Sequence, residues 1–136
     1  MDPKTQLMHR WFEEVWNKQN EAAIDEMFAP DGTAHGLKGD KSMMRGPADF
    51  KPFWQNFRKA FPDIRIDVVD TICEGDKVVA HCVVRGTHRG DSLGIAPKNK
   101  PVEFSGTVIV RVKDGKIATQ SDYYDALGFY KQLGLM

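Results

Sequence analysis

A two-residue turn at Asp114-Gly115 constrains the fold most, because it joins two segments in which apolar and polar residues alternate. An Asp-Gly pair in this setting is a strong signal for a β-hairpin. If Lys113 pairs with Lys116 and the pairing continues without interruption, one face of the hairpin forms an apolar wall. On this register the wall is made of Val102, Phe104, Gly106, Val108, Val110, Val112, Ile117, Thr119, Ser121, Tyr123 and Asp125.

Asp125 stands out because this register places its carboxylate at the rim of the apolar wall, opposite Phe104. A carboxylate there is costly unless it is paired or used in chemistry. One interpretation is a general base, whose pKa the apolar setting raises. The other is an N-cap for a helix that begins at Ala126, which would lower that pKa. Asp122 and Tyr124 fall on the opposite face, where we expect a subunit interface.

Size and charge exclude several classes of protein. With 136 residues the chain is predicted to form a single domain, 1–136. Nineteen Lys and Arg balance nineteen Asp and Glu, which argues against nucleic acid and acidic membrane as partners. No stretch has the length of a membrane span, and the charged first residues lack a signal-peptide pattern, so we expect a cytoplasmic protein. Cys73 and Cys82 are expected to be buried free thiols.

Helical patterns come first along the chain. Apolar residues at helical spacing predict one helix up to Trp16, a shorter one ending near Phe28 and a third that opens at Gly46-Pro47. The segment 37–45 is expected to be an exposed loop. The third helix carries an aromatic face, formed by Phe50, Phe53, Trp54, Phe57 and Phe61.

Period-two patterns follow from Ile64 onward and predict strands over 64–73 and 77–88, in which Asp70 faces His81. The strand 77–88 is apolar on both faces, so we expect helices on one side and a partner subunit or further structure on the other. The chain closes with a short helix, 126–133. The predicted fold class is α+β, with three N-terminal helices packed on a strongly curved, mostly antiparallel sheet.

Polar residues from several segments could converge on a cavity inside this sheet. Small residues at Gly106 and Ser121 favour such a cavity, and His35, Tyr123 and Asp125 could reach it. His81 with Asp70 could form a catalytic dyad or a satisfied interior pair, and His88 could orient a substrate oxygen or serve a structural role. No spacing typical of a zinc site occurs, so no metal is expected.

Several motifs together resemble one known family. They are GPADF, AFPDI, the Gly86-Thr87-His88 segment, the Gly94-Ile95-Ala96-Pro97 loop, and DYYDALGFYKQLG. The chain resembles, over nearly its whole length, the SnoaL-like polyketide cyclases, or ester cyclase-like proteins, of the nuclear transport factor two-like superfamily. The resemblance implies a cone-shaped α+β barrel, commonly a homodimer, with a pocket inside the cone. It also implies a cofactor-free aldol cyclisation in which a pocket Asp, here Asp125, is the acid/base, near a histidine that corresponds to His35.

These arguments predict a cofactor-independent enzyme that acts on a small apolar carbonyl compound. Asp125 would be the acid/base, while His35 and Tyr123 would polarise the oxygen. One alternative is an epoxide hydrolase-like enzyme in which Asp125 or Asp122 activates water; another is a non-catalytic module that binds an apolar ligand or a partner protein. Ser121 stands where many relatives have Trp, which would widen the pocket. The expected substrate-binding residues are Trp54, Phe57, Phe104, Val108, Ser121, His88 and His81.

Overall fold

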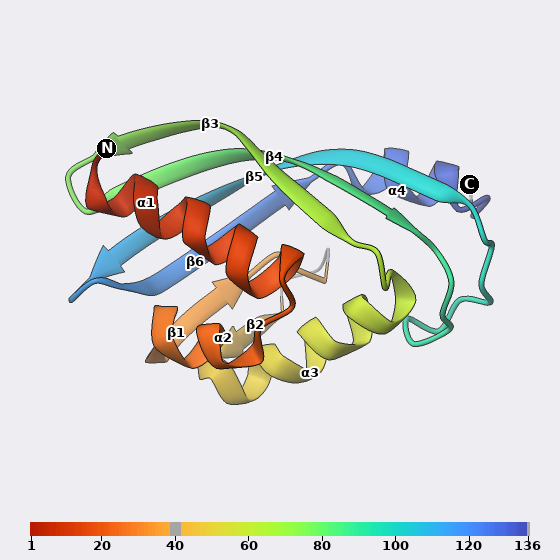
Figure 1. The fold of residues 1–136 in the computed structure, drawn as a ribbon, viewed down its shortest axis with the longest axis horizontal. Coiled ribbons are helices and arrows are strands. Elements are labelled where there is room, and N and C mark those ends of the chain that lie inside the picture. The colour runs from red at the N-terminus through yellow and green to blue at the C-terminus, as the bar shows by residue number, and fades with distance from the viewer. Residues whose placement is uncertain (39–41, 136) are drawn as a thin grey trace.

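A computed structural model describes residues 1–38 and 42–135 and shows a six-stranded sheet with helices on one face (Figure 1). The strand order is β2-β1-β6-β5-β4-β3, and β1 runs parallel to β6 while the other pairs are antiparallel. The elements in chain order are α1 (Pro3–Arg10), η1 (Trp11–Asn17), α2 (Glu21–Met27), β1 (Phe28–His35), β2 (Met43–Arg45), α3 (Gly46–Ala60), β3 (Arg65–Glu74), β4 (Lys77–Thr87), β5 (Pro101–Lys113), β6 (Lys116–Tyr124) and α4 (Ala126–Gln132).

The first predicted helix begins as α1 and continues directly into the π-helix η1. Asp2 caps it, because its Oδ1 accepts the Lys4 N–H at 2.7 Å, and Pro3 occupies the first turn. The apolar residues that predicted this helix are buried in both segments. Among the described residues, no helix is long and apolar enough to span a membrane.

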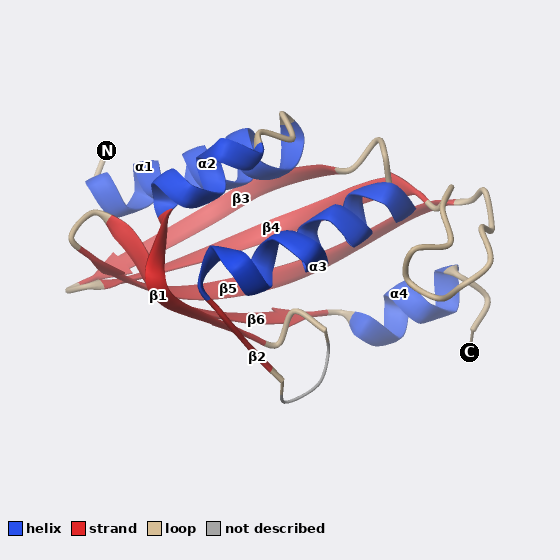
Figure 2. Cartoon of the chain, turned by 90° about the horizontal axis from the view of Figure 1, so that it is seen from below, coloured by secondary structure: helices blue, strands red, loops and turns tan. Residues whose placement is uncertain are grey.

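All helices before the long strands pack on the concave face of the curved sheet, which Figure 2 shows from below. Asn17 ties the end of η1 to β3: its Nδ2 donates to the Ile66 carbonyl at 2.9 Å and its Oδ1 accepts the Ile66 N–H at 2.7 Å. Phe50 and Trp54 of α3 are fully buried against this layer. The predicted α+β class, the helical layer and the short C-terminal helix are therefore confirmed.

The predicted loop over 37–45 is wrong at its end, because Met43–Arg45 form the edge strand β2. This strand pairs with β1, where Ala34 lies opposite Met44, and Met44 is buried. Residues 39–41 of the predicted loop lie outside the described residues. The short strand extends the sheet beyond β1, and its Met44 side chain joins the hydrophobic core.

A β-bulge in β3 changes which side chains face inward. Val68 pairs with Cys82 and Asp70 with His81, so Val69 is the extra residue. The predicted pairing of Asp70 with His81 is confirmed, but on the far side of the bulge Cys82 pairs with Val68 and not with Val69, as it would in an uninterrupted ladder. Beyond the bulge the faces are exchanged, and Ile72 is 67% exposed.

A second bulge, at Ala118 in β6, decides the composition of the inner wall. Val112 pairs with Ile117 as predicted, but Arg111 pairs with Thr119 and Val108 with Asp122. The predicted pairing of Val108 with Ser121 is therefore wrong, because the extra residue shifts every later pair by one position. The inner face of β6 is formed by Gln120, Asp122 and Tyr124, while Ser121 and Tyr123 belong to the outer face.

Candidate functional site

An apolar pocket lies between the concave face of the sheet and the helices. It holds about 700 Å³ of empty space, counted out to its open mouth. Helices η1, α3 and α4 and strands β3 to β6 all contribute to its wall. The lining residues are Phe12, Trp16, Leu37, Phe53, Phe57, Ile64, Ile66, Cys82, Val84, Phe104, Gly106, Thr107, Val108, Gln120, Asp122, Tyr123, Tyr124 and Phe129.

Asp122 is the carboxylate of this pocket. Burial in the apolar wall raises its pKa to about 7, and a hydrogen bond from Gln120, whose Nε2 donates to Oδ2 at 2.9 Å, works in the opposite direction. Because Asp122 holds its proton near neutral pH and can release it there, it is suited to exchange protons with a bound molecule.

Two neighbours of Asp122 reflect the same apolar setting. Gln120 is 3% exposed, and its Oε1 is buried with no hydrogen-bond partner among the described residues. Burial, followed by the negative charge of Asp122, raises the pKa of the Cys82 thiol to about 12. Cys82 is therefore a neutral thiol at physiological pH rather than a nucleophile.

Aromatic rings from three helices and one strand line the same pocket as this carboxylate. Trp16 meets Phe57 edge to face with ring centroids 5.9 Å apart, and Phe57 stacks on Phe129 at 6.5 Å. Phe129 in turn packs on Phe104 at 4.9 Å. This arrangement gives the pocket a continuous aromatic wall from η1 through α3 and α4 to β5.

Of the residues predicted to bind substrate, Phe57, Phe104 and Val108 line the pocket. Gly106, predicted to be a small residue on the inner wall, also lines it. Tyr123 borders the pocket, but it is 65% exposed and lies on the outer face of β6, so its predicted inward orientation is wrong. Ser121 lies on that outer face as well, opposite Ile109, and is not among the described lining residues.

Asp125 does not lie on the apolar wall predicted for it. It is exposed, and its Oδ1 accepts the Gly128 N–H at 2.9 Å, so it is the N-cap of α4. The capping interpretation is thus confirmed. A Cβ built at Gly128 would meet the Asp125 carboxyl group, so a larger residue at this third helical position would make the capping side chain shift.

The histidines and Trp54 also lie apart from the described pocket lining. His35 is half-buried on the outer face of β1, where its Nε2 is 3.3 Å from Thr33 Oγ1. His81 is exposed, and its predicted partner Asp70 accepts the Thr71 N–H. Trp54 is a core residue whose Nε1 donates to the Val15 carbonyl at 3.0 Å.

His88 is a buried residue that organises the loop after β4. Its Nδ1 accepts the Lys98 N–H at 3.1 Å, and burial together with the charge of Lys98 lowers its pKa. Its backbone N–H donates to the Lys100 carbonyl, and its carbonyl accepts the Asn99 N–H. The structural interpretation of His88 fits these contacts. Elsewhere too, the described residues include no cluster of three or more His, Cys, Asp or Glu side chains arranged to hold a metal ion.

The sequence carried little signal for Asp122 because β6 lacks a diagnostic hydrophobic pattern. After Ile117, the next four residues are small or polar on both faces, so no apolar alternation reveals the bulge at Ala118. The turn at Asp114-Gly115 predicts the register of β6 only as far as the first irregularity. One inserted residue exchanges the inward and outward faces of the rest of the strand. Ile117 and Gln120 are both buried although they are three positions apart, which only the structure reveals.

Comparison with known proteins agrees with this geometry. Residues 6–133 match the family model described as SnoaL-like polyketide cyclase. Aklanonic acid methyl ester cyclase DauD of Streptomyces sp. (strain C5) is 28% identical over 137 residues, covering 98% of this chain and 83% of that protein.

Solved structures share the whole fold. IdmH, a candidate polyketide cyclase from Streptomyces antibioticus, is 29% identical with a TM-score of 0.84, over 98% of this chain and 99% of that one. TsrD from Streptomyces laurentii superimposes with a TM-score of 0.87 at 24% identity, over 100% and 99% of the two chains, which shows a common fold. Because the family model spans nearly all of the sequence, this chain belongs to the SnoaL-like polyketide cyclase family.

Proposed function

We propose that this protein is a cofactor-independent cyclase that acts on an apolar carbonyl compound, with Asp122 as its acid/base. The observation that carries the proposal is the Asp122 carboxyl group, which has a pKa of about 7 and is the one carboxyl group among the described residues that line the aromatic pocket. The cyclase activity named for relatives such as DauD supports the reaction type. Free thiols at Cys73 and Cys82 are compatible with the cytoplasm as its compartment.

The proposed reaction is an intramolecular aldol addition in which protons and electrons balance. The Asp122 carboxylate removes a proton from the carbon next to a carbonyl group, which leaves an enolate and a protonated Asp122. The enolate carbon attacks a second carbonyl carbon of the same molecule, so that one carbon–carbon bond forms and one C=O π bond becomes an alkoxide. The alkoxide takes the proton from Asp122, and the carboxylate is restored.

The remaining pocket residues would position the substrate rather than react with it. Gln120 holds Asp122 Oδ2 and thereby orients the carboxyl group. The aromatic wall excludes water, which would otherwise protonate the enolate before the ring closes. Ketosteroid isomerase offers a chemical precedent, because carboxyl groups in its apolar site also form and stabilise an enolate.

The epoxide hydrolase alternative is less well supported by this pocket. Two carboxylates with an Arg between them are expected for that branch, whereas Asp122 is the one carboxylate among the described lining residues, and no Arg lines the pocket there. A non-catalytic binding module remains the competing class, and activity measurements separate it from the cyclase.

The test compares Asp122→Asn with Asp125→Asn, which makes the same chemical change outside the pocket. Aklanonic acid methyl ester, named for the relatives, is the first substrate to try, with the cyclised isomer followed by chromatography. We expect Asp122→Asn to lower kcat by about 10²-fold or more and Asp125→Asn to stay near wild type. Wild-type kcat/KM should rise with pH up to about 7 and then level off, because the free enzyme must hold the carboxylate.

A second readout requires no ring closure. In D₂O, the wild-type protein should exchange the hydrogen next to the carbonyl of a bound ketone faster than Asp122→Asn does. Equal exchange and equal turnover in the two proteins would overturn the proposed role of Asp122.

A further inference from the structure

No positively charged side chain of the described residues lines the pocket. Among the described residues that line it, Asp122 carries the one carboxylate, and no Lys, Arg or His joins it. The other titratable lining groups are Cys82, Tyr123 and Tyr124, each of which is neutral or negative when it titrates. When Asp122 is ionised, the site therefore holds a negative charge that no cation from the described lining residues balances.

Aromatic side chains form much of the surface that a ligand would meet. Phe12 and Trp16 come from η1, Phe53 and Phe57 from α3, and Phe129 from α4. Trp16 contacts both Phe53 and Phe57 edge to face, at 6.4 and 5.9 Å between centroids. Aromatic π systems attract cations, and the effect is larger where water is excluded.

We propose that this pocket is a binding site for apolar organic ammonium ions, which would pair with the Asp122 carboxylate inside the aromatic wall. A tertiary or quaternary ammonium ion with alkyl or aryl groups fits this chemistry because its charge is spread over carbon-bound surface and weakly hydrated. Its entry gives the buried carboxylate a counter-ion and gives the cation aromatic neighbours. Lys and Arg side chains of other proteins fit less well, since the apolar wall offers few partners for their N–H groups.

The proposed ammonium site is the same pocket as the proposed cyclase site, but ammonium binding does not require turnover. Neutral carbonyl compounds would accept a hydrogen bond from protonated Asp122, and their binding would weaken as the pH rises. Ammonium ions need the ionised form, and their binding would strengthen over the same range. The two ligand classes thus have opposite pH dependence, which originates in one group.

The experiment compares two ligands of nearly equal shape, phenyltrimethylammonium and tert-butylbenzene, which differ in charge. Binding is followed by the chemical shift of the Trp16 indole N–H and by fluorescence. For phenyltrimethylammonium we expect about tenfold tighter binding at pH 8.5 than at pH 6, because the ionised fraction of a group with a pKa of about 7 rises by that factor. The affinity for tert-butylbenzene should not rise.

Two variants decide the assignment. Asp122→Asn should lose both the preference for the cation and its pH dependence while keeping tert-butylbenzene binding, which shows that the pocket is still folded. Asp125→Asn, with the same loss of charge at the exposed cap, should bind like wild type. The proposal is overturned if wild type binds the two ligands equally at pH 8.5, or if Asp122→Asn keeps the cation preference. Because neither ligand reacts, a failed cyclase assay leaves this result unaffected.

Discussion

The buried position of the Asp122 carboxyl group has an energetic cost. Burial raises its pKa from 3.8 to about 7, so the folded protein holds this proton more tightly than the unfolded chain does. Below the unfolded value both states are protonated and the group costs nothing. As the pH rises from about 4 to about 7, the unfolded state ionises first, and the native state loses stability relative to it. Above pH 7 the penalty is complete and constant.

Asp122→Asn removes this penalty while preserving the shape of the side chain. At pH 8.5 we expect the variant to be more stable than wild type by up to about 4 kcal/mol, which corresponds to about three pKa units. The difference should shrink toward zero near pH 4. Urea denaturation of both proteins across this range measures it, and a difference that does not change with pH would contradict the burial of this carboxyl group.

At the scale of single elements, α4 depends on Asp125, the residue that caps its N-terminus. Asp125→Ala removes the acceptor for the Gly128 N–H, so we expect a loss of about 1 kcal/mol in the free energy of unfolding. Phe129 of α4 packs on Phe104 at the end of the pocket, and this contact holds that part of the helix in place. The helix should therefore fray first in its N-terminal turn, where the cap is lost. Hydrogen exchange of the α4 amides tests the fraying. Asp125→Asn is the matched control, because Asn caps helices as well as Asp does.

The β6 bulge makes a second prediction at this scale. Deleting Ala118 should give a regular ladder in which Thr119 still pairs with Arg111 and Asp122 with Val108, because the extra residue precedes both pairs. We therefore expect Asp122 to remain in the pocket with a raised pKa. The protein should be less stable, since bulges supply twist and bending to a curved sheet. Carboxyl-carbon NMR of the deletion variant measures the pKa of Asp122. A value near 3.8 would mean that Asp122 has left the pocket wall, and it would contradict the prediction.

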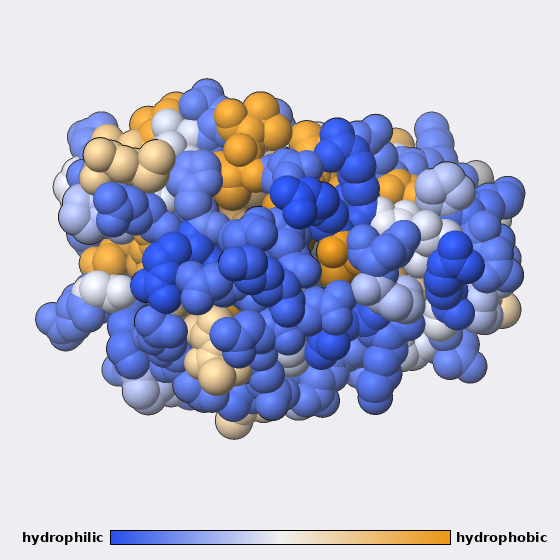
Figure 3. All heavy atoms as spheres, in the orientation of Figure 1, coloured by the Kyte–Doolittle hydropathy of each residue, from blue (hydrophilic) through white to orange (hydrophobic). Residues whose placement is uncertain are grey.

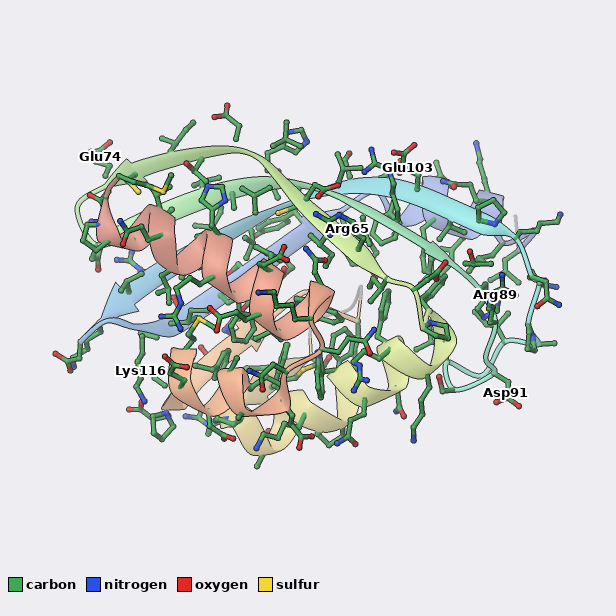
Figure 4. All side chains as sticks on the ribbon, in the orientation of Figure 1. Arg65, Glu74, Arg89, Asp91, Glu103 and Lys116 are labelled. Carbon is green, nitrogen blue, oxygen red and sulfur yellow. The ribbon has the colours of Figure 1, made fainter. Side chains whose placement is uncertain are left out.

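At the scale of the whole molecule, we propose that a second copy of the chain binds to the outer face of the sheet. It exposes Ile72, Ile109 and Tyr123, and Figure 3 shows apolar residues along the upper margin of the molecule, where β3 runs in Figure 1. Charges of both signs accompany them. Arg85 bonds to Asp67 and Glu103 at 2.8 Å each, and Arg65 to Asp67 at 3.1 Å, on strands β3 to β5; Figure 4 labels Arg65 and Glu103.

A face with apolar residues and both charges can be complementary to itself, as a two-fold dimer requires. We expect wild type to sediment as a dimer and Ile109→Glu to sediment as a monomer with an unchanged circular dichroism spectrum. Lys98→Gln, in the loop after β4, lowers the net charge by the same one unit at another exposed position and should remain dimeric. A monomeric wild-type protein at micromolar concentration would rule out this use of the face.

The sequence alone determined the elements that repeat a pattern over many residues. The aromatic face of α3 and the alternation in β5 are such repeated patterns, and the Asp114-Gly115 turn is a specific local signal. The α+β fold and wall residues such as Phe57, Phe104 and Val108 could therefore be predicted. The tertiary structure decided the register of β6. It thereby decided that the carboxyl group in the pocket wall belongs to Asp122 and not to Asp125. The physical reason is that a strand has a period of two, so a single bulged residue at Ala118 moves every later side chain to the other face.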